Sequence, residues 1–266
     1  KKAFEDLAIP TAAFYKIDDL EELKILADQI QFPAIIKTRT QGYDGKGQEI
    51  VRNKQQIFEK YPLFLGKPVI VEEFVSFNYE ISIIAVRSEN EIKFYPVCEN
   101  VHKNGILFCS KVKLKTHPLQ KQAEDYALKI LNKFNYIGVL TIEFFVVENQ
   151  LIANEMAPRV HNSGHWSIDA SYCSQFENHL RAICNLPLGD SNPFAYAAMF
   201  NLVGTLPPKK DLLKIPGIKW HDYEKTAKQN RKLGHVTLLN TDYQDFCEYF
   251  SFLEQYLDFN KTYATI

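Results

Sequence analysis

VLTIEFFVVENQLIANEMAPRVHNSGHW, residues 139–166, contains two apolar, β-branched runs separated by the polar segment Glu-Asn-Gln. Such a pattern predicts a β-hairpin with a three-residue loop. With Asn149 at the centre of that loop, residues equally distant from it face each other across the two strands. Glu143 is therefore predicted to lie directly opposite Glu155, on one face of the hairpin.

Two carboxylates in directly opposed positions have Cβ atoms only about 5 Å apart, and their repulsion destabilises a sheet. A shared proton or a divalent cation would offset that repulsion. Mg²⁺ prefers oxygen ligands, takes one or two carboxylates from the protein and leaves its other positions for phosphate oxygens. The hairpin therefore predicts a Mg-nucleotide site at Glu143 and Glu155. The alternative is a pair of solvated glutamates, which a slip of one residue in register would produce.

Composition argues against several other classes of function. The chain has 266 residues, a formal net charge of -1 and no long basic run, so binding of nucleic acid by charge alone is not expected. No apolar run reaches the roughly 18 residues of a membrane span, and the first residues do not resemble an export signal. The five cysteines are scattered and never in a C-x-x-C spacing. This favours a reducing, cytoplasmic location over disulfides or zinc.

A lysine-bearing strand and a glycine-rich loop lie near the start of the chain. Alternation in AIIKTR, residues 34–39, predicts a strand with Lys37 and Arg39 on one face. The loop that follows leads into another strand rather than a helix, so it resembles a flap whose backbone N–H groups fold over phosphates. Lys37 would contact phosphate oxygens at its base. An ordinary hairpin turn and a surface lysine remain the alternatives. The predicted flap residues are Gly42, Tyr43, Asp44, Gly45, Lys46, Gly47 and Gln48.

An acidic strand end supplies further nucleotide-binding candidates. The segment Glu72, Glu73, Phe74 and Val75 closes a predicted strand and could pair its backbone with an adenine edge, while Glu80 could accept from ribose hydroxyls. The alternative for the acidic pair is a set of solubilising charges. His102 lies between two later strands, where a loop histidine with ordinary polar partners and a nucleotide contact are both open.

Polar donors crowd the segment after the hairpin, which contains Arg159, His161, Asn162, Ser163 and His165 and ends at Trp166. So many donors with so little apolar content are poorly suited to a core. They are suited to binding an oxyanion and orienting a polar substrate.

The rest of the chain predicts a two-part organisation. Amphipathic or capped helices are predicted over residues 20–30, 119–134, 173–183 and 243–257. Proline and glycine at residues 186–193 indicate a boundary between residues 1–190 and a small α/β domain at 195–266. Within the first part, a flap-bearing lobe is predicted at about 12–77 and a larger lobe at 78–190. The basic segment 225–232 is predicted to be a solvated loop, with substrate phosphate as a minority alternative.

These motifs, in this order, resemble those of ATP-grasp enzymes, an α+β fold in which two lobes hold ATP between them. Within that superfamily, the flap GYDGKGQ at 42–48 and the run NEMAPRVHNSGHW at 154–166 are similar to the PurK family, the ATPase subunits of phosphoribosylaminoimidazole carboxylase. Gly234 and His235 match a late segment of that family. The resemblance implies ATP and Mg²⁺ as cofactors, Glu143 and Glu155 as metal ligands, and Asn154 among the nucleotide contacts.

The implied reaction is ATP-dependent carboxylation, by bicarbonate through carboxyphosphate, of the exocyclic amine of 5-aminoimidazole ribonucleotide in purine biosynthesis. Arg159, Asn162 and His165 become the candidate catalytic residues, because a guanidinium matches a planar carboxylate and the other two can orient the intermediate and the amine. A homodimer is also considered. Two departures are noted: the family's usual first α/β domain is absent from this sequence, which could cost activity, and Ala157 stands where many ATP-grasp enzymes have a metal-binding asparagine.

Two other functions remain open from the sequence. Another ATP-grasp ligase that activates a carboxylic acid as an acyl phosphate would share everything up to Glu155 and differ in the segment that follows. A nucleotide-binding module without turnover would have little use for Lys37 together with both glutamates.

Overall fold

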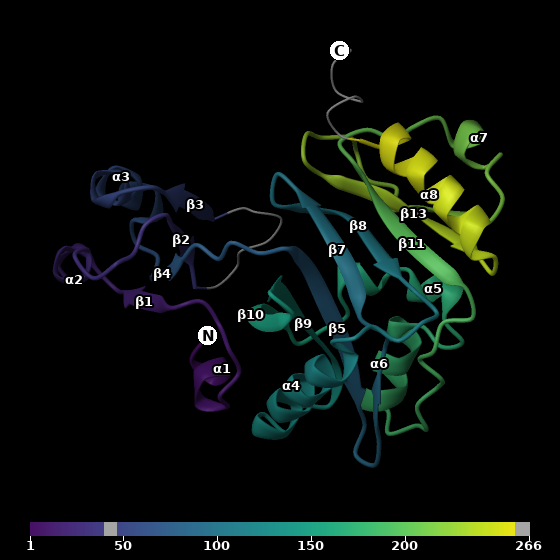
Figure 1. The fold of residues 1–266 in the computed structure, drawn as a ribbon, viewed down its shortest axis with the longest axis horizontal. Helices are drawn as coiled ribbons and strands as arrows, with labels where there is room; N and C mark the ends of the chain where they lie inside the picture. Colours follow the sequence, from purple (N-terminus) through teal and green to yellow (C-terminus); the bar gives the residue numbers. More distant parts are fainter. Residues whose placement is uncertain (40–46, 259–266) are drawn as a thin grey trace.

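The computed structural model describes residues 1–39 and 47–258, whose strands form two sheets. The smaller sheet has the order β1-β4-β2-β3, and the larger has the order β10-β9-β5-β7-β8-β11-β13-β12, with β6 paired to β5 (Figure 1). The strands are β1 (Phe14–Ile17), β2 (Ala34–Thr38), β3 (Gln48–Val51), β4 (Val69–Glu73), β5 (Tyr79–Arg87), β6 (Ile92–Phe94), β7 (Cys98–Lys103), β8 (Ile106–Val112), β9 (Gly138–Val147), β10 (Gln150–Ala157), β11 (Tyr196–Val203), β12 (Ile218–Asp222) and β13 (Lys232–Asn240). The helices are α1 (Lys2–Asp6), α2 (Leu20–Leu26), α3 (Lys54–Lys60), η1 (Tyr61–Phe64), α4 (Gln120–Lys133), η2 (Asn162–Gly164), α5 (Ser167–Ala170), α6 (Gln175–Ile183), α7 (Lys209–Leu212) and α8 (Tyr243–Tyr256).

The smaller sheet and helices α2 and α3 form a separate lobe, at the left of Figure 1. Helix α2 begins where Asp19 accepts a hydrogen bond from the backbone N–H of Glu22, as the sequence predicts for an aspartate at this position. Its Leu23 packs with Ile36 and Val71 in a core of this lobe's own. The sheet that carries Lys37 is therefore stabilised by a hydrophobic core within this lobe.

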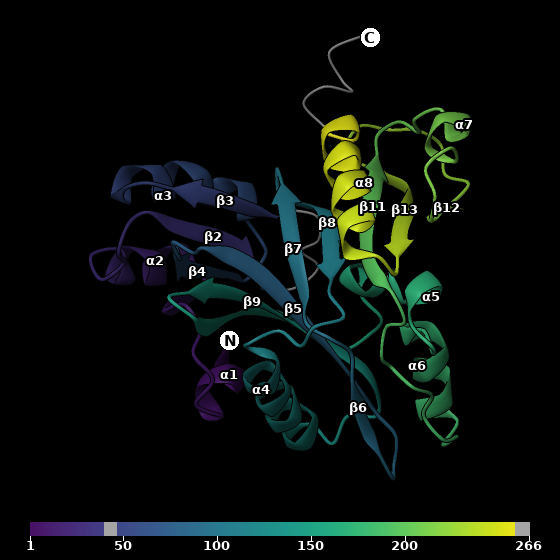
Figure 2. The same ribbon diagram turned by 45° about the vertical axis from the view of Figure 1, so that its right-hand side comes forward.

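The larger sheet forms the centre of the molecule and is covered on both faces. Helix α4 packs against β5 and β9 through Ala123, Ala127 and Ile130, the apolar stripe predicted for this helix. Helix α6 covers the opposite face of the same strands, where Trp166 and Ala182 are buried (Figure 2). Because both faces are packed, the hairpin β9–β10 has a fixed position within the core.

The last part of the chain extends this sheet. Strand β11 pairs with β8, with Ala197 opposite Val112 and Phe200 opposite Cys109, and β13 continues the ladder on the other side of β11. Helix α8 packs on these strands through Phe246 and Leu253, in a cluster that also contains Phe108. The division into domains at residues 190–195 stays a prediction, and hydrogen bonds of the sheet cross it.

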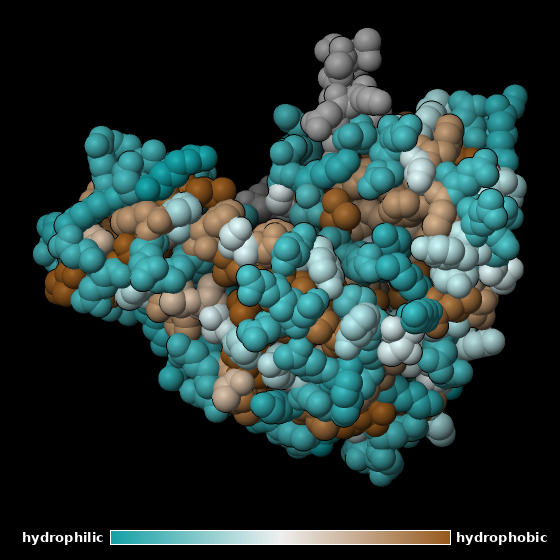
Figure 3. All heavy atoms as spheres, viewed as in Figure 1, coloured by the Kyte–Doolittle hydropathy of each residue, from teal (hydrophilic) through white to brown (hydrophobic). Residues whose placement is uncertain are grey.

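The surface is hollowed between the lobe with α2 and α3 and the rest of the molecule (Figure 3). Polar side chains dominate the face shown there, with smaller apolar areas between them. Within the ranges that the structure describes, no helix has the length and apolar content needed to cross a membrane.

Candidate active site

The hairpin β9–β10 places Glu143 opposite Glu155, as predicted, but by a different route. The predicted three-residue loop is wrong: Gln150 pairs with Val147, so only Glu148 and Asn149 form the turn. Both have positive φ, 48° and 66°, as two-residue turns that match the twist of the strands require. This register alone would place Asn154 opposite Glu143.

A β-bulge then corrects the register by one residue. It lies between Ala153 and Glu155, so Asn154 is the extra residue and Glu155 pairs with Glu143. Ala153 and Phe144, one position earlier, remain buried in the core. The bulge therefore keeps the apolar face inward and still brings both carboxylates to the other face.

The two carboxylates have different environments. Glu143 is 9% exposed, whereas Glu155 is exposed. Burial raises the pKa of Glu143 to about 7, and the negative charges of Glu155 and Glu80 act in the same direction. The charges of His102 and Lys232 offset this only in part. A site with two converging carboxylates, one of them buried, fits a hard divalent cation. The residues present therefore fit Mg²⁺, held by Glu143 and Glu155.

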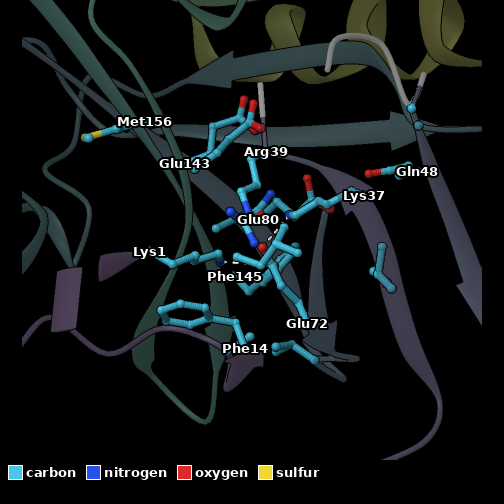
Figure 4. A pocket seen from close by; sticks show the side chains of 18 of the residues that line it. Lys1, Phe14, Lys37, Arg39, Gln48, Glu72, Glu80, Glu143, Phe145 and Met156 are labelled. Atoms are coloured by element: carbon cyan, nitrogen blue, oxygen red, sulfur yellow. Dashed lines mark ion pairs between the residues drawn. The ribbon is translucent and has the colours of Figure 1, made fainter. Parts of the chain in front are cut away.

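Across the cavity, a buried carboxylate holds two lysines (Figure 4). Glu72 lies 2.9 Å from Lys37 Nζ and 3.1 Å from Lys1 Nζ. Because Glu72 pairs with Ile35 in the sheet, Lys37, two residues further along β2, is on the same face. Burial lowers the pKa of Lys1 to about 8, partly offset by Glu72. Glu72 thus orients two ammonium groups into the cavity, a role that its strand-end position did not suggest.

The remaining residues of the predicted hinge have engaged backbones. The N–H of Glu73 donates to Ala13 O, and the N–H of Phe74 donates to Pro33 O. These two N–H groups therefore have partners within the protein. The groups that could still pair with an adenine edge, as predicted, are the carbonyl groups of these residues and the backbone of Val75. All of these residues line the cavity.

Glu80 and His102 form an ion pair on the neighbouring strands β5 and β7. Burial lowers the pKa of His102, but the hydrogen bond to Glu80 and the charges of Glu143 and Glu80 outweigh it, so the net shift is upward. His102 is thus a histidine with a carboxylate partner at the cavity wall. His102 lies within β7 and not in the predicted segment between two strands. The roles of Glu80 and His102 as nucleotide contacts stay predictions.

Most of the predicted flap lies outside the described residues. This applies to Gly42, Tyr43, Asp44, Gly45 and Lys46. Gly47 and Gln48 are described, and both line the cavity. Gln48 pairs with Lys37 across β2 and β3, so the end of the loop is anchored next to the predicted phosphate lysine.

The segment after the hairpin supplies three residues to the cavity wall: Arg159, His161 and Asn162. Burial lowers the pKa of His161 to about 3, and the charge of Arg159 acts in the same direction, so this ring is neutral at ordinary pH. The Asn162 amide forms a two-way pair with Asn201 on β11, with distances of 3.1 and 2.7 Å. Asn201 therefore fixes the orientation of Asn162.

His165 is not among the residues that line the cavity. Its Nδ1 lies 3.0 Å from the carbonyl oxygen of His161, and its ring packs against Phe176 and His235. Burial lowers its pKa to about 4. Gly164 is required just before it, because a Cβ there would approach Ile84 Cδ1 to 2.3 Å. The catalytic role of His165 stays a prediction.

The cavity that joins these groups has a volume of about 890 Å³. It extends between the two sheets: Figure 4 shows Glu80 and Glu143, from the larger sheet, together with Lys37 and Glu72, from the smaller one. Several residues at its wall were not predicted as site residues, among them Lys1, Arg39, His161 and Lys232. Arg39 shared a predicted face with Lys37, His161 lay in the donor-rich segment, and Lys232 ended the basic segment. These three patterns could have identified Arg39, His161 and Lys232 as site residues from the sequence.

A second polar cluster lies beside His165. His221 Nε2 is 2.8 Å from Asp169 Oδ2, and the ring of His221 stacks on that of His235 with a centroid separation of 4.3 Å and an angle of 13°. Three ligand atoms of these residues lie within 4.8 Å of one another. Stacked rings have nearly parallel lone pairs, which cannot both converge on one ion. The cluster is therefore better described as a hydrogen-bonded pair, His221 and Asp169, that connects β12 to helix α5.

Comparisons with known proteins agree with this geometry. The model of the ATP-grasp domain matches residues 2–176, and the model of the phosphoribosylaminoimidazole carboxylase C-terminal domain matches residues 197–248. The N5-carboxyaminoimidazole ribonucleotide synthase of Pseudomonas aeruginosa is 45% identical over 243 residues, which cover 91% of this chain and 67% of that protein. The chain spans about two thirds of the length of the curated relatives it matches.

Solved structures show the same relationship. N5-carboxyaminoimidazole ribonucleotide synthetase from Thermus thermophilus has a TM-score of 0.88 at 41% identity, covering 97% of this chain and 71% of that chain. The Aspergillus clavatus N5-carboxyaminoimidazole synthase in complex with ADP and 5-aminoimidazole ribonucleotide has a TM-score of 0.86 at 26% identity, with the same coverage. These similarities confirm the predicted α+β ATP-grasp fold.

Proposed function

Because this chain belongs to the ATP-grasp family of N5-carboxyaminoimidazole ribonucleotide synthases, we propose that it carries out ATP-dependent carboxylation of 5-aminoimidazole ribonucleotide by bicarbonate. The reaction is a ligation in purine biosynthesis. The observation that carries the proposal is one cavity whose wall includes Lys1 and Lys37, the two opposed carboxylates and the segment with Arg159. This combination suits a triphosphate, its cation and a small oxyanion.

Phosphoryl transfer depends mainly on positioning and on neutralising charge. Lys37 and Lys1, both held by Glu72, contribute two cations on the side of the smaller sheet. When bound, Mg²⁺ would neutralise phosphate charge from the side of Glu143 and Glu155. Apolar side chains of the cavity wall, among them Phe14 and Phe145, give a surface that suits a nucleobase. ATP is thus proposed to lie between the two lobes.

Bicarbonate is proposed to bind at the segment after the hairpin. The Arg159 guanidinium can form two parallel hydrogen bonds with a planar carboxylate, and the neutral ring of His161 can donate to one of its oxygens. The product of phosphoryl transfer, carboxyphosphate, is labile in water, so a cavity closed between two lobes favours its use. Asn162 and His165 are proposed to orient it and the amine that it carboxylates. Lys232, on β13, supplies a cation for the ribonucleotide phosphate.

Location and assembly are part of the same proposal. All five cysteines are free, which supports the cytoplasm as the location. Leu180 and Ile183 on α6 are 59% and 53% exposed, which supports a homodimer that covers them. Light scattering of the purified chain would measure the mass, and a monomer at every concentration would contradict the dimer.

The test is an ADP and phosphate release assay on this chain and on a version extended by the N-terminal region that its relatives have. Release should depend on bicarbonate and on 5-aminoimidazole ribonucleotide together. Stimulation by an amino acid and another carboxylic acid, without bicarbonate, would instead identify a different ATP-grasp ligase. Tight ATP binding without turnover in both versions would identify a binding module.

A further inference from the structure

A continuous row of buried polar side chains leads from the middle of the large sheet to the cavity. Ser110 Oγ donates to Asn100 Oδ1 at 2.7 Å, Asn100 Nδ2 donates to Ser82 Oγ at 3.0 Å, and Ser82 Oγ donates to Ser163 Oγ at 2.8 Å. Ser163 Oγ then lies 2.9 Å from His161 Nδ1. The first four residues are at most 5% exposed, so water cannot substitute for these partners.

The direction of the row is set at its cavity end, where the backbone N–H of Ser163 donates to His161 Nδ1, so that this nitrogen accepts from the Ser163 hydroxyl as well. The two ends of the Asn100 amide differ: its oxygen accepts from Ser110 and its nitrogen donates to Ser82. Because Ser82 accepts from Asn100, its single hydroxyl proton is available for Ser163. Ser163 accepts that proton and directs its own to His161. Each hydroxyl therefore donates toward the cavity.

His161 receives two donors on the same ring nitrogen. The Ser163 hydroxyl approaches Nδ1, and the backbone N–H of Ser163 also donates to Nδ1, at 3.3 Å. A nitrogen that accepts carries no proton, so the proton of the ring is on Nε2. Nε2 faces the cavity, 3.7 Å from Glu143 Oε1. The ring is thus a donor on its cavity side.

His165, four residues later, lacks such an arrangement. Its Nδ1 lies 3.0 Å from the carbonyl oxygen of His161, which can only accept, and 3.2 Å from Gln175 Nε2, which can only donate. These two partners favour opposite protonation states of Nδ1, so they do not select one tautomer of His165.

We propose that Ser163, Ser82 and Asn100 are positioning residues that hold His161 as an Nε2–H donor directed into the cavity. Resting on the function proposed above, this donor binds an oxygen of bicarbonate or of the carboxyphosphate formed from it. His161 therefore does not take a proton from the amine, because the nitrogen that reaches the cavity already carries one. The three residues act through His161 and do not touch the substrate.

A two-bond ¹H–¹⁵N correlation spectrum of the histidine-labelled chain tests the tautomers directly. It separates protonated from bare ring nitrogens, and His161→Gln and His165→Gln variants assign the signals among the seven histidines. His161 should show a protonated Nε2 and a bare Nδ1. A protonated Nδ1 on His161 would overturn the proposal. This result does not depend on the reaction, so it stands apart from a failure of the proposed function.

Graded variants then test the row. Ser163→Ala should draw the two His161 nitrogen signals together as the second tautomer becomes populated, and Ser82→Ala should do so less, because Ser163 keeps its hydroxyl. Ser191→Ala is the matched control: Ser191 is also buried, but it donates to Phe94 O and lies outside the row. Unchanged His161 signals in Ser163→Ala, in a chain that still folds, would overturn the proposal.

Enzyme kinetics of the same variants distinguish loss of His161 positioning from a general loss of stability. In Ser163→Ala, bicarbonate-dependent phosphate release should fall about 10–100-fold in kcat, the usual range for losing a partner that orients a site residue. The KM for ATP should stay within about twofold, because Lys37 and Glu72 are untouched. An equal loss in Ser191→Ala would show that stability, and not the row, controls the rate, and would overturn the proposal.

Discussion

Glu155 faces Glu143 across β9 and β10 because Asn154 occupies a β-bulge between Ala153 and Glu155. The bulge turns two carboxylates toward one point while Ala153 and Phe144 stay in the core. Directly opposed like charges destabilise a sheet, so this arrangement favours a bound cation. The first two predictions follow from that pair.

Glu155→Gln should reduce Mg²⁺-dependent ATP turnover by more than about 100-fold, because even the outer partners of metal ligands typically contribute 10–100-fold. The amide keeps the shape of the side chain, and Glu155 is exposed, so the melting temperature should change little. Turnover and circular dichroism measure the two effects. Near-normal turnover would remove Glu155 from the metal site.

Glu143→Gln should lose turnover but stabilise the metal-free protein above pH 7. The pKa of Glu143 is raised from 4.5 to about 7 by burial, so folding opposes its ionisation. The resulting cost is absent below pH 4.5, grows as the pH rises through 7 and is constant above it. It amounts to about 3 kcal/mol, since one pKa unit corresponds to about 1.4 kcal/mol.

Urea unfolding without Mg²⁺ at pH 4.5 and pH 8 would measure this difference. Wild type and Glu143→Gln should be similar at the lower pH and differ at the higher one, and Mg²⁺ should stabilise only the wild type. Equal stability at pH 8 would show that Glu143 ionises in the folded protein without cost.

Glu72→Gln should destabilise the free protein by on the order of 3 kcal/mol, because Lys37 and Lys1 lose their buried counter-charge. Phosphate groups can replace that charge. ATP should therefore raise the melting temperature of Glu72→Gln by more than it raises that of the wild type. An ATP-induced shift smaller than that of the wild type would indicate that Glu72 contacts the nucleotide itself.

Arg159→Ala should retain ATP binding and lose bicarbonate-dependent phosphate release. Arg159→Lys is the matched variant, since it keeps the charge and loses the planar fork. It should recover only a small part of the rate if two parallel hydrogen bonds matter. Isothermal titration with ATP and a phosphate assay over a range of bicarbonate concentrations would separate binding from turnover. An unchanged rate in Arg159→Ala would remove its role as the anion ligand.

The sequence was sufficient for the opposed carboxylates, because the alternation of apolar residues along a strand determines which of its faces is buried. The prediction of Glu143 opposite Glu155 is confirmed although the loop was wrong, since a turn shorter by one residue and a bulge longer by one residue cancel. Nothing in the residue types of Glu148 or Asn154 predicts the shorter turn or the bulge. A two-residue turn of this kind needs positive φ values. Residues such as Asp and Asn can adopt them, but their presence does not show that they do.

Contacts between distant residues were beyond sequence reasoning. Glu72 was predicted as part of a nucleotide hinge because it ends a strand, and its pairing with Lys1 and Lys37 depends on sheet register. His161 and His165 look equivalent in sequence, yet only His161 lines the cavity. His165 packs against Phe176 and His235, and these rings meet it only in the folded chain.

The unbroken ladder from β10 to β12 determines which parts can move. Glu143 on β9 and Lys232 on β13 belong to one hydrogen-bonded sheet, so the distance between them is set by its pleats and twist. Lys37 belongs to the other sheet, whose lobe has a core of its own. We therefore expect any opening of the cavity to be a rotation of the smaller lobe relative to the larger sheet, and a crosslink between the two sheets should block it.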